Sequence, residues 1–149
     1  MARLLLLNGP NLGLLGTREP TLYGKSSLPD IEAALRRRAE AAGHELQAFQ
    51  SDSEAELLGR IHRARDDKTA VILFNPAAFT HTSIALRDAL LAVQVPFIEL
   101  HLSNVAAREE FRRRSFFSDI ALGTITGFGV GSYELALDAA LRYVSTGGK

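Results

Sequence analysis

Short apolar runs alternate along the chain with longer segments in which apolar residues recur every three or four positions. The short runs have the length of buried strands, and the longer segments have the period of amphipathic helices. We expect strands over residues 4–7, 45–50, 70–74, 96–101 and 122–126. We expect helices over residues 30–42, 54–65, 82–93, 106–113 and 133–144. Ser27 and Ser53 stand where capping residues of the first two helices are expected, each with an acidic residue three positions later.

The repeated alternation of strand and helix predicts a parallel sheet with helices on both faces. Right-handed crossovers leave few arrangements of five such strands, so we expect an α/β, flavodoxin-like three-layer fold with strand order 2-1-3-4-5. Because no repeat, low-complexity tract or linker interrupts the pattern, we expect residues 1–149 to form a single domain. In this architecture ligands bind beyond the carboxyl ends of the strands.

Composition and charge narrow the class of protein. Hydrophobic residues make up 46% of the chain and charged residues 23%, which is ordinary for a globular domain. Basic and acidic residues both number 17, a balance that does not favour binding to nucleic acid. The first apolar run is too short for a signal sequence or a membrane span. The absence of cysteine excludes disulfides and thiolate metal sites and is compatible with a reducing compartment. It removes one argument against the cytoplasm, which is the location we expect.

Polar residues follow three neighbouring strands of the predicted sheet, at the end where a ligand is expected. Glu99 and His101 lie two positions apart on one strand, so their side chains leave the same face. A carboxylate beside an imidazole fixes its tautomer and stabilises its charged form, which suits a general acid near neutral pH. A structural ion pair is the simpler interpretation, but the position at the strand's carboxyl end favours a functional one. The polar residues of this rim include Asn8, Asn11, Asn75, His81, His101 and Ser103.

The loop over residues 12–26 is long for a connection between a strand and a helix. It carries Arg18 and Tyr23, and long loops in compact domains are typically lids or binding loops, although a plain surface loop is the alternative. Its glycines do not have the spacing of a dinucleotide-binding loop, and Pro10 lacks the backbone N–H that would bind a phosphate. A phosphate-binding loop is therefore only weakly indicated.

Two further positions have both a functional and a structural interpretation. His81 lies at the start of the helix expected over residues 82–93, where free N–H groups favour an anion. The alternative is that Thr82 caps this helix and His81 is incidental. Arg108 and Arg112 fall four residues apart on a predicted helix, which is either a solvated helix or one that turns an arginine toward a ligand.

Other chemistries are poorly supported. A hydrolytic triad of a serine, His81 and Asp88 lacks the glycine-flanked serine turn that such enzymes require. The four histidines lack the spacing of a metal-binding helix, so we expect no metal site.

The chain resembles the type II dehydroquinases from its first strand to its last helix. Gly13 and Phe79 depart from residues common in that family, where asparagine and tyrosine are frequent. The segments that carry the resemblance are LNGPNL at 7–12, LGTREP at 15–20 with YG at 23–24, NPAAFTHTS at 75–83 with ALRDA at 85–89, ELHLSN at 99–104 with REEFR at 108–112, and GFG at 127–129 with Tyr133.

The resemblance implies a lyase of the shikimate pathway that converts 3-dehydroquinate to 3-dehydroshikimate by anti-elimination through an enolate, without metal or cofactor. It implies that Tyr23 is the base, that Arg18 lowers the pKa of Tyr23, and that the loop over residues 12–26 is the lid. Asn11 stabilises the enolate, and His101, oriented by Glu99, protonates the departing hydroxyl. The implied substrate-binding residues are Asn75, Ser103 and the backbone of Leu102 for the carboxylate, His81 and Arg112 for the ring hydroxyls, and Asp88 in a neighbouring subunit's site.

The same resemblance implies a homo-oligomer, a dodecamer built from trimers, with no nucleic-acid or membrane partner. Two alternatives stay open at this stage. A flavodoxin-like module that binds a flavin or nucleotide would explain the fold and the glycines. A catalytically inactive scaffold would explain the fold but should lack Arg18, Tyr23 or His101, all of which are present.

Overall fold

The computed structural model describes residues 1–17 and 26–148 of the chain. Five parallel strands form one sheet in the order β2-β1-β3-β4-β5, which confirms the expected flavodoxin-like α/β fold. The elements, joined by short 3-10 turns labelled η, are β1 (Arg3–Asn8), η1 (Leu12–Leu14), α2 (Leu28–Ala41), β2 (Glu45–Gln50), α3 (Glu54–Asp66), β3 (Thr69–Asn75), η2 (Ala77–His81), α4 (Ile84–Val93), β4 (Phe97–His101), η3 (Val105–Ala107), η4 (Glu110–Arg112), β5 (Gly123–Thr126) and α5 (Gly131–Ser145).

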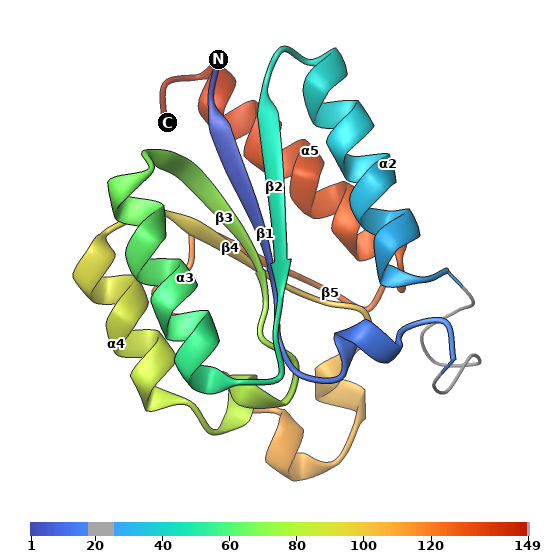
Figure 1. Cartoon of the computed structure of the whole chain (residues 1–149). Helices are drawn as coiled ribbons and strands as arrows, with labels where there is room; N and C mark the ends of the chain where they lie inside the picture. The colour runs from blue at the N-terminus through green and yellow to red at the C-terminus, as the bar shows by residue number, and fades with distance from the viewer. Residues whose placement is uncertain (18–25, 149) are drawn as a thin grey trace.

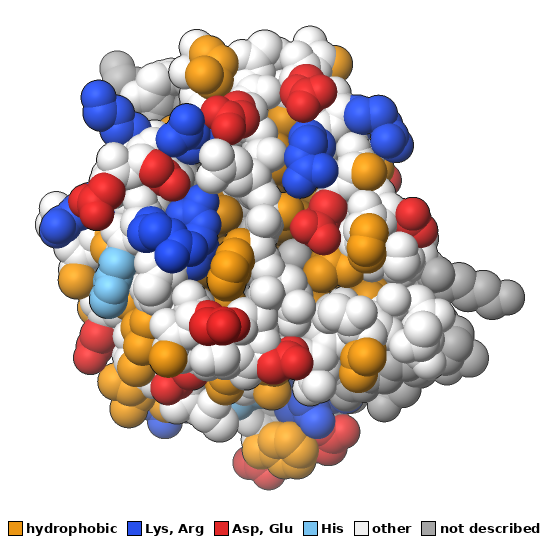
Figure 2. Space-filling view, viewed as in Figure 1, with side chains coloured by type: hydrophobic (Ala, Val, Ile, Leu, Met, Phe, Trp, Pro, Cys, Tyr) orange, Lys and Arg blue, Asp and Glu red, His pale blue; other side chains and the backbone are white. Residues whose placement is uncertain are grey.

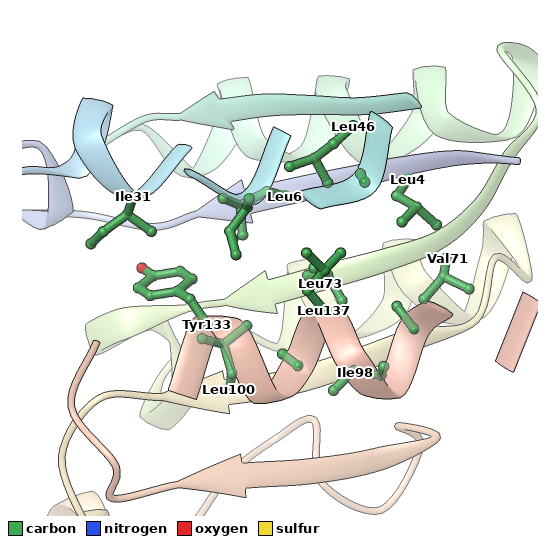
Figure 3. Packing of buried hydrophobic residues seen from close by; sticks show 14 of the residues in the cluster. Leu4, Leu6, Ile31, Leu46, Val71, Leu73, Ile98, Leu100, Tyr133 and Leu137 are labelled. Atoms are coloured by element: carbon green, nitrogen blue, oxygen red, sulfur yellow. The ribbon is translucent and has the colours of Figure 1, made fainter. Parts of the chain in front are cut away.

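Helices cover both faces of the sheet, as Figure 1 shows: α2 and α5 lie on one face, and α3 and α4 on the other. Successive side chains of a strand point to opposite faces, and β1 is apolar throughout because both of its faces are covered. Leu4 and Leu6 pack in the cluster with α2 and α5, which Figure 3 shows, whereas Leu5 and Leu7 pack with α3 and α4. This two-sided packing holds the central strands rigidly and fixes the positions of their carboxyl ends.

The helix starts follow the expected capping chemistry, with one correction. The Ser27 hydroxyl accepts a hydrogen bond from the Asp30 N–H at 3.3 Å, and the Ser53 hydroxyl accepts one from the Glu56 N–H at 3.2 Å. Thr82 does not cap α4. Residues 77–81 form a 3-10 turn, so the helix begins at Ile84, and Ser83 is the capping residue that accepts from the Leu86 N–H at 3.0 Å.

The prediction of a helix over residues 106–113 is wrong. The segment forms two 3-10 turns, η3 and η4, separated by extended backbone at Arg108 (ψ −164°). Neither turn contains a buried residue, and Phe111 is 66% exposed. Because most helical stability in proteins comes from burying an apolar face, a short segment with no such face does not form a regular helix.

Charged side chains of both signs are interspersed over the face seen in Figure 2, in keeping with the equal numbers of basic and acidic residues. In the part of the chain that the structure describes, none of the helices has the length and apolar character that crossing a membrane requires.

Candidate active site

The loops that follow β1, β3 and β4 gather at the carboxyl ends of the strands, at the lower end of the sheet in Figure 1. β1 and β3 are paired so that Asn8 lies beside Asn75, and the Gly9 N–H donates to the Asn75 carbonyl at 2.8 Å. A Cβ atom at Gly9 would lie 2.4 Å from the Pro76 carbonyl oxygen. Only glycine therefore allows these two loops to touch, and their contact sets the floor of the site.

A cavity of about 220 Å³ opens between these loops. Seven of the residues predicted from the sequence line it, together with Arg108 from the segment after β4. The lining residues are Pro10, Asn11, Leu12, Leu15, Asn75, Ala77, Ala78, His81, His101, Leu102, Ser103, Val105, Arg108 and Arg112.

Glu99 and His101 form a buried pair at the end of β4. Both side chains leave the same face of the strand, and the His101 Nε2–H donates to Glu99 Oε2 at 2.6 Å. Glu99 is only 1% exposed and His101 only 5%. Burial raises the pKa of the Glu99 carboxyl, but hydrogen bonds from His101 and Ser118 and the nearby His101 ring outweigh burial and hold that pKa below its usual range. Glu99 is therefore an anion that fixes one imidazole nitrogen of His101 as a donor and leaves Nδ1 as the other ring nitrogen.

Asn75 is held by a chain of hydrogen bonds that runs back into the core. Its Nδ2–H donates to the Tyr133 hydroxyl at 3.1 Å, and that hydroxyl donates to Asn8 Oδ1 at 2.7 Å. The Asn75 Oδ1 accepts from the Ala77 N–H at 3.2 Å. Burial raises the pKa of Tyr133 far above its usual range, so this phenol stays protonated and acts as a fixed donor. The second Nδ2 hydrogen of Asn75 is left for a group in the cavity.

Two basic residues, His81 and Arg112, also line the cavity. His81 directs its Nδ1–H to the Arg114 carbonyl at 2.8 Å, which leaves Nε2 as its second hydrogen-bonding atom. Arg112 pairs through Nε with Glu109, and its guanidinium lies 5.0 Å from the centre of the Phe111 ring. These contacts support the arginine without a helix, so the failure of the predicted helix does not remove Arg112 from the site.

Asn11 lies at the mouth of the cavity in a left-handed backbone conformation, with φ 68°. Its N–H donates to Asp52 Oδ1 at 2.9 Å, and Gln50 Nε2 donates to the same oxygen at 3.1 Å. Asparagine tolerates this conformation better than most residues, which gives a local reason for its presence. The loop after β1 is thereby tied to the end of β2.

Taken together, the site offers a buried imidazole hydrogen-bonded to an anion, an amide, a hydroxyl, a second imidazole and two arginines. Such a set suits a small anionic molecule with hydroxyl groups. Ligand pockets for drug-sized molecules usually enclose about 300–1,000 Å³, so a cavity of about 220 Å³ fits something smaller. Among residues 1–17 and 26–148, no cluster of three or more histidine and acidic side chains is placed to hold a metal.

Comparison with known proteins identifies the origin of this arrangement. The family model described as "Dehydroquinase class II" matches residues 2–141, which is nearly the whole chain. The chain belongs to the class II dehydroquinase family.

Relatives of this dehydroquinase are similar over their full length. A protein named 3-dehydroquinate dehydratase from Stenotrophomonas maltophilia (strain K279a) is 61% identical over 145 residues, covering 97% of this chain and 99% of the relative. One of the same name from Xanthomonas oryzae pv. oryzae (strain PXO99A) is 63% identical over 141 residues, covering 95% of each. The crystal structure of type II dehydroquinase from Propionibacterium acnes superimposes with a TM-score of 0.90 at 46% identity, covering 95% of this chain and 97% of that one.

Of the predicted site residues of this dehydroquinase, Asn11, Asn75, His81, His101, Leu102, Ser103 and Arg112 come together around the cavity. Glu99 lies behind His101 rather than in the lining. Asp88 is exposed on α4 and lies in a different hollow, beside Arg87 and Asp119, so it does not reach the cavity of its own chain. Arg18, Tyr23 and most of the predicted lid lie outside the described residues.

Three contributors were not predicted as site residues. Arg108 lines the cavity, and the REEFR motif that contains it was the available signal. Ser115 and Ser118 contact Glu99 from 16 and 19 residues away. No sequence pattern links them to Glu99, because the return of the chain after η4 brings them together.

Proposed function

We propose that this class II dehydroquinase is a 3-dehydroquinate dehydratase, a hydro-lyase that removes water from 3-dehydroquinate to give 3-dehydroshikimate in the shikimate pathway. The observation that carries the proposal is the buried Glu99–His101 pair, with Nδ1 of His101 left for a substrate in a cavity of matching polarity. The relatives that match nearly the whole chain have the same activity in their names.

His101 is the general acid in this proposal. Loss of a hydroxyl is slow unless the leaving oxygen receives a proton, and a positioned imidazolium contributes typically about 10²–10⁴-fold to such a step. The anionic Glu99 accepts the Nε2–H hydrogen bond of His101 and so holds the imidazole ring in one orientation. Burial of the pair keeps water from competing for the proton.

Before the hydroxyl leaves, a base removes the proton alpha to the ketone and forms an enolate, which Asn11 stabilises. Tyr23 is the base. Of the three tyrosines, Tyr133 is buried with a raised pKa, and Tyr143 lines a separate hollow beside β5. Arg18 assists Tyr23: bringing phenol ionisation to near neutral pH takes roughly 3–4 kcal/mol, and a cation about 4 Å away contributes on the order of 4 kcal/mol at an effective dielectric near 20.

The substrate carboxylate binds Asn75, Ser103 and the Leu102 N–H, while His81 and Arg112 bind the ring hydroxyls. Support comes from the geometry of the described residues. The free Nδ2 hydrogen of Asn75 belongs to an amide whose orientation is set by Tyr133. Arg108 lines the same cavity as Arg112 and adds positive charge for an anionic ligand.

A flavin- or nucleotide-binding module is not favoured. The family model matches nearly the whole chain and is named for a different activity, and the chain has no tryptophan and only three tyrosines to stack on a flavin.

The proposal also covers the domain organisation, the location and the oligomeric state of the protein. Residues 1–149 form one domain whose loop over residues 12–26 acts as the lid. The protein works in the cytoplasm as a dodecamer built from trimers, an expectation that rests on family resemblance. The exposure of Asp88, away from its own cavity, is consistent with a role in a neighbouring subunit's site.

The test follows absorbance of the conjugated enone formed from 3-dehydroquinate, with EDTA present. We expect turnover by the native protein. In His101→Ala we expect loss of water to fall at least about 100-fold, while exchange of the alpha proton with solvent deuterium falls much less. Absence of enone formation by the native protein contradicts the proposed function. Equal losses of both steps in His101→Ala contradict the role of His101 alone.

A further inference from the structure

Glu99 is held by two serines as well as by His101. The Ser115 hydroxyl donates to Glu99 Oε2 at 2.8 Å, and the Ser118 hydroxyl donates to Oε1 at 2.6 Å. With His101 Nε2–H on Oε2, both carboxylate oxygens are occupied by donors. Neither serine lines the cavity, and neither belongs to the sheet.

The direction of the Ser115 hydroxyl is fixed by its other contacts. Its oxygen accepts hydrogen bonds from the Phe117 N–H at 3.0 Å and from the Ser118 N–H at 3.2 Å. With both of its acceptor positions engaged, the hydroxyl hydrogen is left for Glu99. The turn that follows Ser115 therefore orients a donor at the carboxylate.

The serine-bearing turn is anchored in the core. Phe117 is fully buried and meets the Phe74 ring edge-on, with 5.2 Å between the ring centres. Phe74 lies on β3 directly beside Glu99 on β4. The Phe116 N–H also donates to the Thr80 carbonyl, one residue before His81, at 3.0 Å. The two serines are thus fixed relative to the same strands that present the cavity residues.

An ionised carboxylate accepts three such donors, whereas a protonated one must give up an acceptor position. Donors that bind the anion oppose the effect of burial on the Glu99 pKa. The carboxylate also has no freedom to rotate, so Oε2 stays opposite the His101 ring.

We propose that Ser115 and Ser118 are positioning residues for the general acid, acting through Glu99 to fix the ring of His101, an inference that rests on the proposed function. They touch neither the cavity nor a ligand in it. They contribute to proton transfer and not to substrate binding, so their loss should lower kcat and leave KM nearly unchanged.

The experiment uses Ser118→Ala and the double variant with Ser115→Ala. Ser118 is an exposed residue, so we expect its substitution to leave the fold intact. We expect kcat for 3-dehydroquinate to fall about tenfold in the double variant, in line with lost hydrogen bonds to a charged group, with KM nearly unchanged. Ser118→Thr, which keeps a hydroxyl, retains the native rate when compared with Ser118→Ala.

A double-mutant cycle separates positioning from general damage. In a Glu99→Gln background, Ser118→Ala has no further effect on kcat if the serine acts through the carboxylate. Equal fold losses in both backgrounds overturn the proposal, as does a native rate in the double serine variant. Ser51→Ala is the matched control, because Ser51 donates to the Glu56 side chain and accepts from the Ser53 N–H but does not line the cavity.

A second readout does not depend on activity. Histidine-selective nitrogen labelling reports the His101 Nε2–H resonance by NMR. We expect Ser118→Ala to shift this resonance and Ser51→Ala to leave it in place; an unshifted resonance in Ser118→Ala overturns the positioning role. If the native protein does not turn over 3-dehydroquinate, the proposed function fails, while this measurement still decides whether the serines fix His101.

Discussion

At the scale of single residues, the site is governed by what surrounds each polar group. The same carboxyl chemistry is found on the surface at Glu109 and in the interior at Glu99, but only Glu99 combines burial with three donors. Similarly, Tyr133 is a phenol within the hydrogen-bond network of Asn75, yet burial removes it from acid–base chemistry. The residue type therefore indicates which groups are candidates for a role, and the burial and hydrogen-bond partners of each group determine its ionisation and contacts.

Glu99 makes the stability of the protein depend on pH in a defined direction. Its pKa in the folded state is lowered, so its contribution is present above the ordinary carboxyl pKa of about 4.3 and is lost as pH falls through the lower folded value. We expect Glu99→Gln to cost about 2 kcal/mol at pH 7 and the difference from the native protein to shrink below pH 4.3.

Urea unfolding followed between neutral and acidic pH measures this difference. Glu40→Gln, at an exposed position on α2, serves as the comparison and should show little cost at any pH. A difference for Glu99→Gln that grows toward acid pH would show that the carboxyl is not held as an anion.

At the scale of elements, the strands were predicted to within about one residue at each end, and β2 was predicted at its observed bounds. Strong two-sided burial leaves such runs no alternative structure. The helix after β4 was wrong because the spacing of its arginines satisfied a helical pattern without an apolar face to bury. Helix α4 begins two residues later than predicted because a 3-10 turn precedes it, and apolar periodicity does not reveal such a turn.

The contact between the loops after β1 and β3 provides a prediction at this scale. Gly9→Ala places a methyl group 2.4 Å from a backbone oxygen, so we expect a loss of stability of about 1–3 kcal/mol and a fall in activity as the loops separate. Gly59→Ala, in the middle of α3 with open space around its Cβ position, should instead stabilise by about 0.5–1 kcal/mol.

Thermal unfolding and the enone assay measure both variants. A Gly9→Ala protein with native stability and native rate would show that the two loops tolerate separation, and that their contact does not set the floor of the site.

At the scale of the whole molecule, one chain brings most of the proposed site together but leaves Asp88 in a separate hollow. If Asp88 serves a neighbouring subunit, the site is complete only in the assembled protein. Symmetric assemblies repeat such a contact at every equivalent interface.

Coexpression of two impaired variants tests this arrangement. We expect Asp88→Ala and Tyr23→Phe each to have low activity. In randomly mixed oligomers about a quarter of the sites combine a native Tyr23 with a native neighbouring Asp88, so activity should recover to about that fraction. Differently tagged subunits, purified through both tags, provide the mixed oligomers. Mixed oligomers no more active than the separate variants would place Asp88 outside the neighbouring site.

The sequence by itself determined the fold class, the strand order and the identity of half of the cavity residues. Apolar periodicity and general rules of chain topology predicted the fold and the polar residues at the ends of parallel strands, and the resemblance to the family added Leu102 and Arg112. Only the tertiary structure decided that Glu99 lies behind His101 rather than in the cavity, that Ser115 and Ser118 bind it, and that Asn75 is tethered to Tyr133. These contacts join residues distant in the chain through packed aromatic rings and returning loops. Their geometry depends on how the strands, helices and loops pack together in three dimensions, and a local sequence pattern contains no information on that packing.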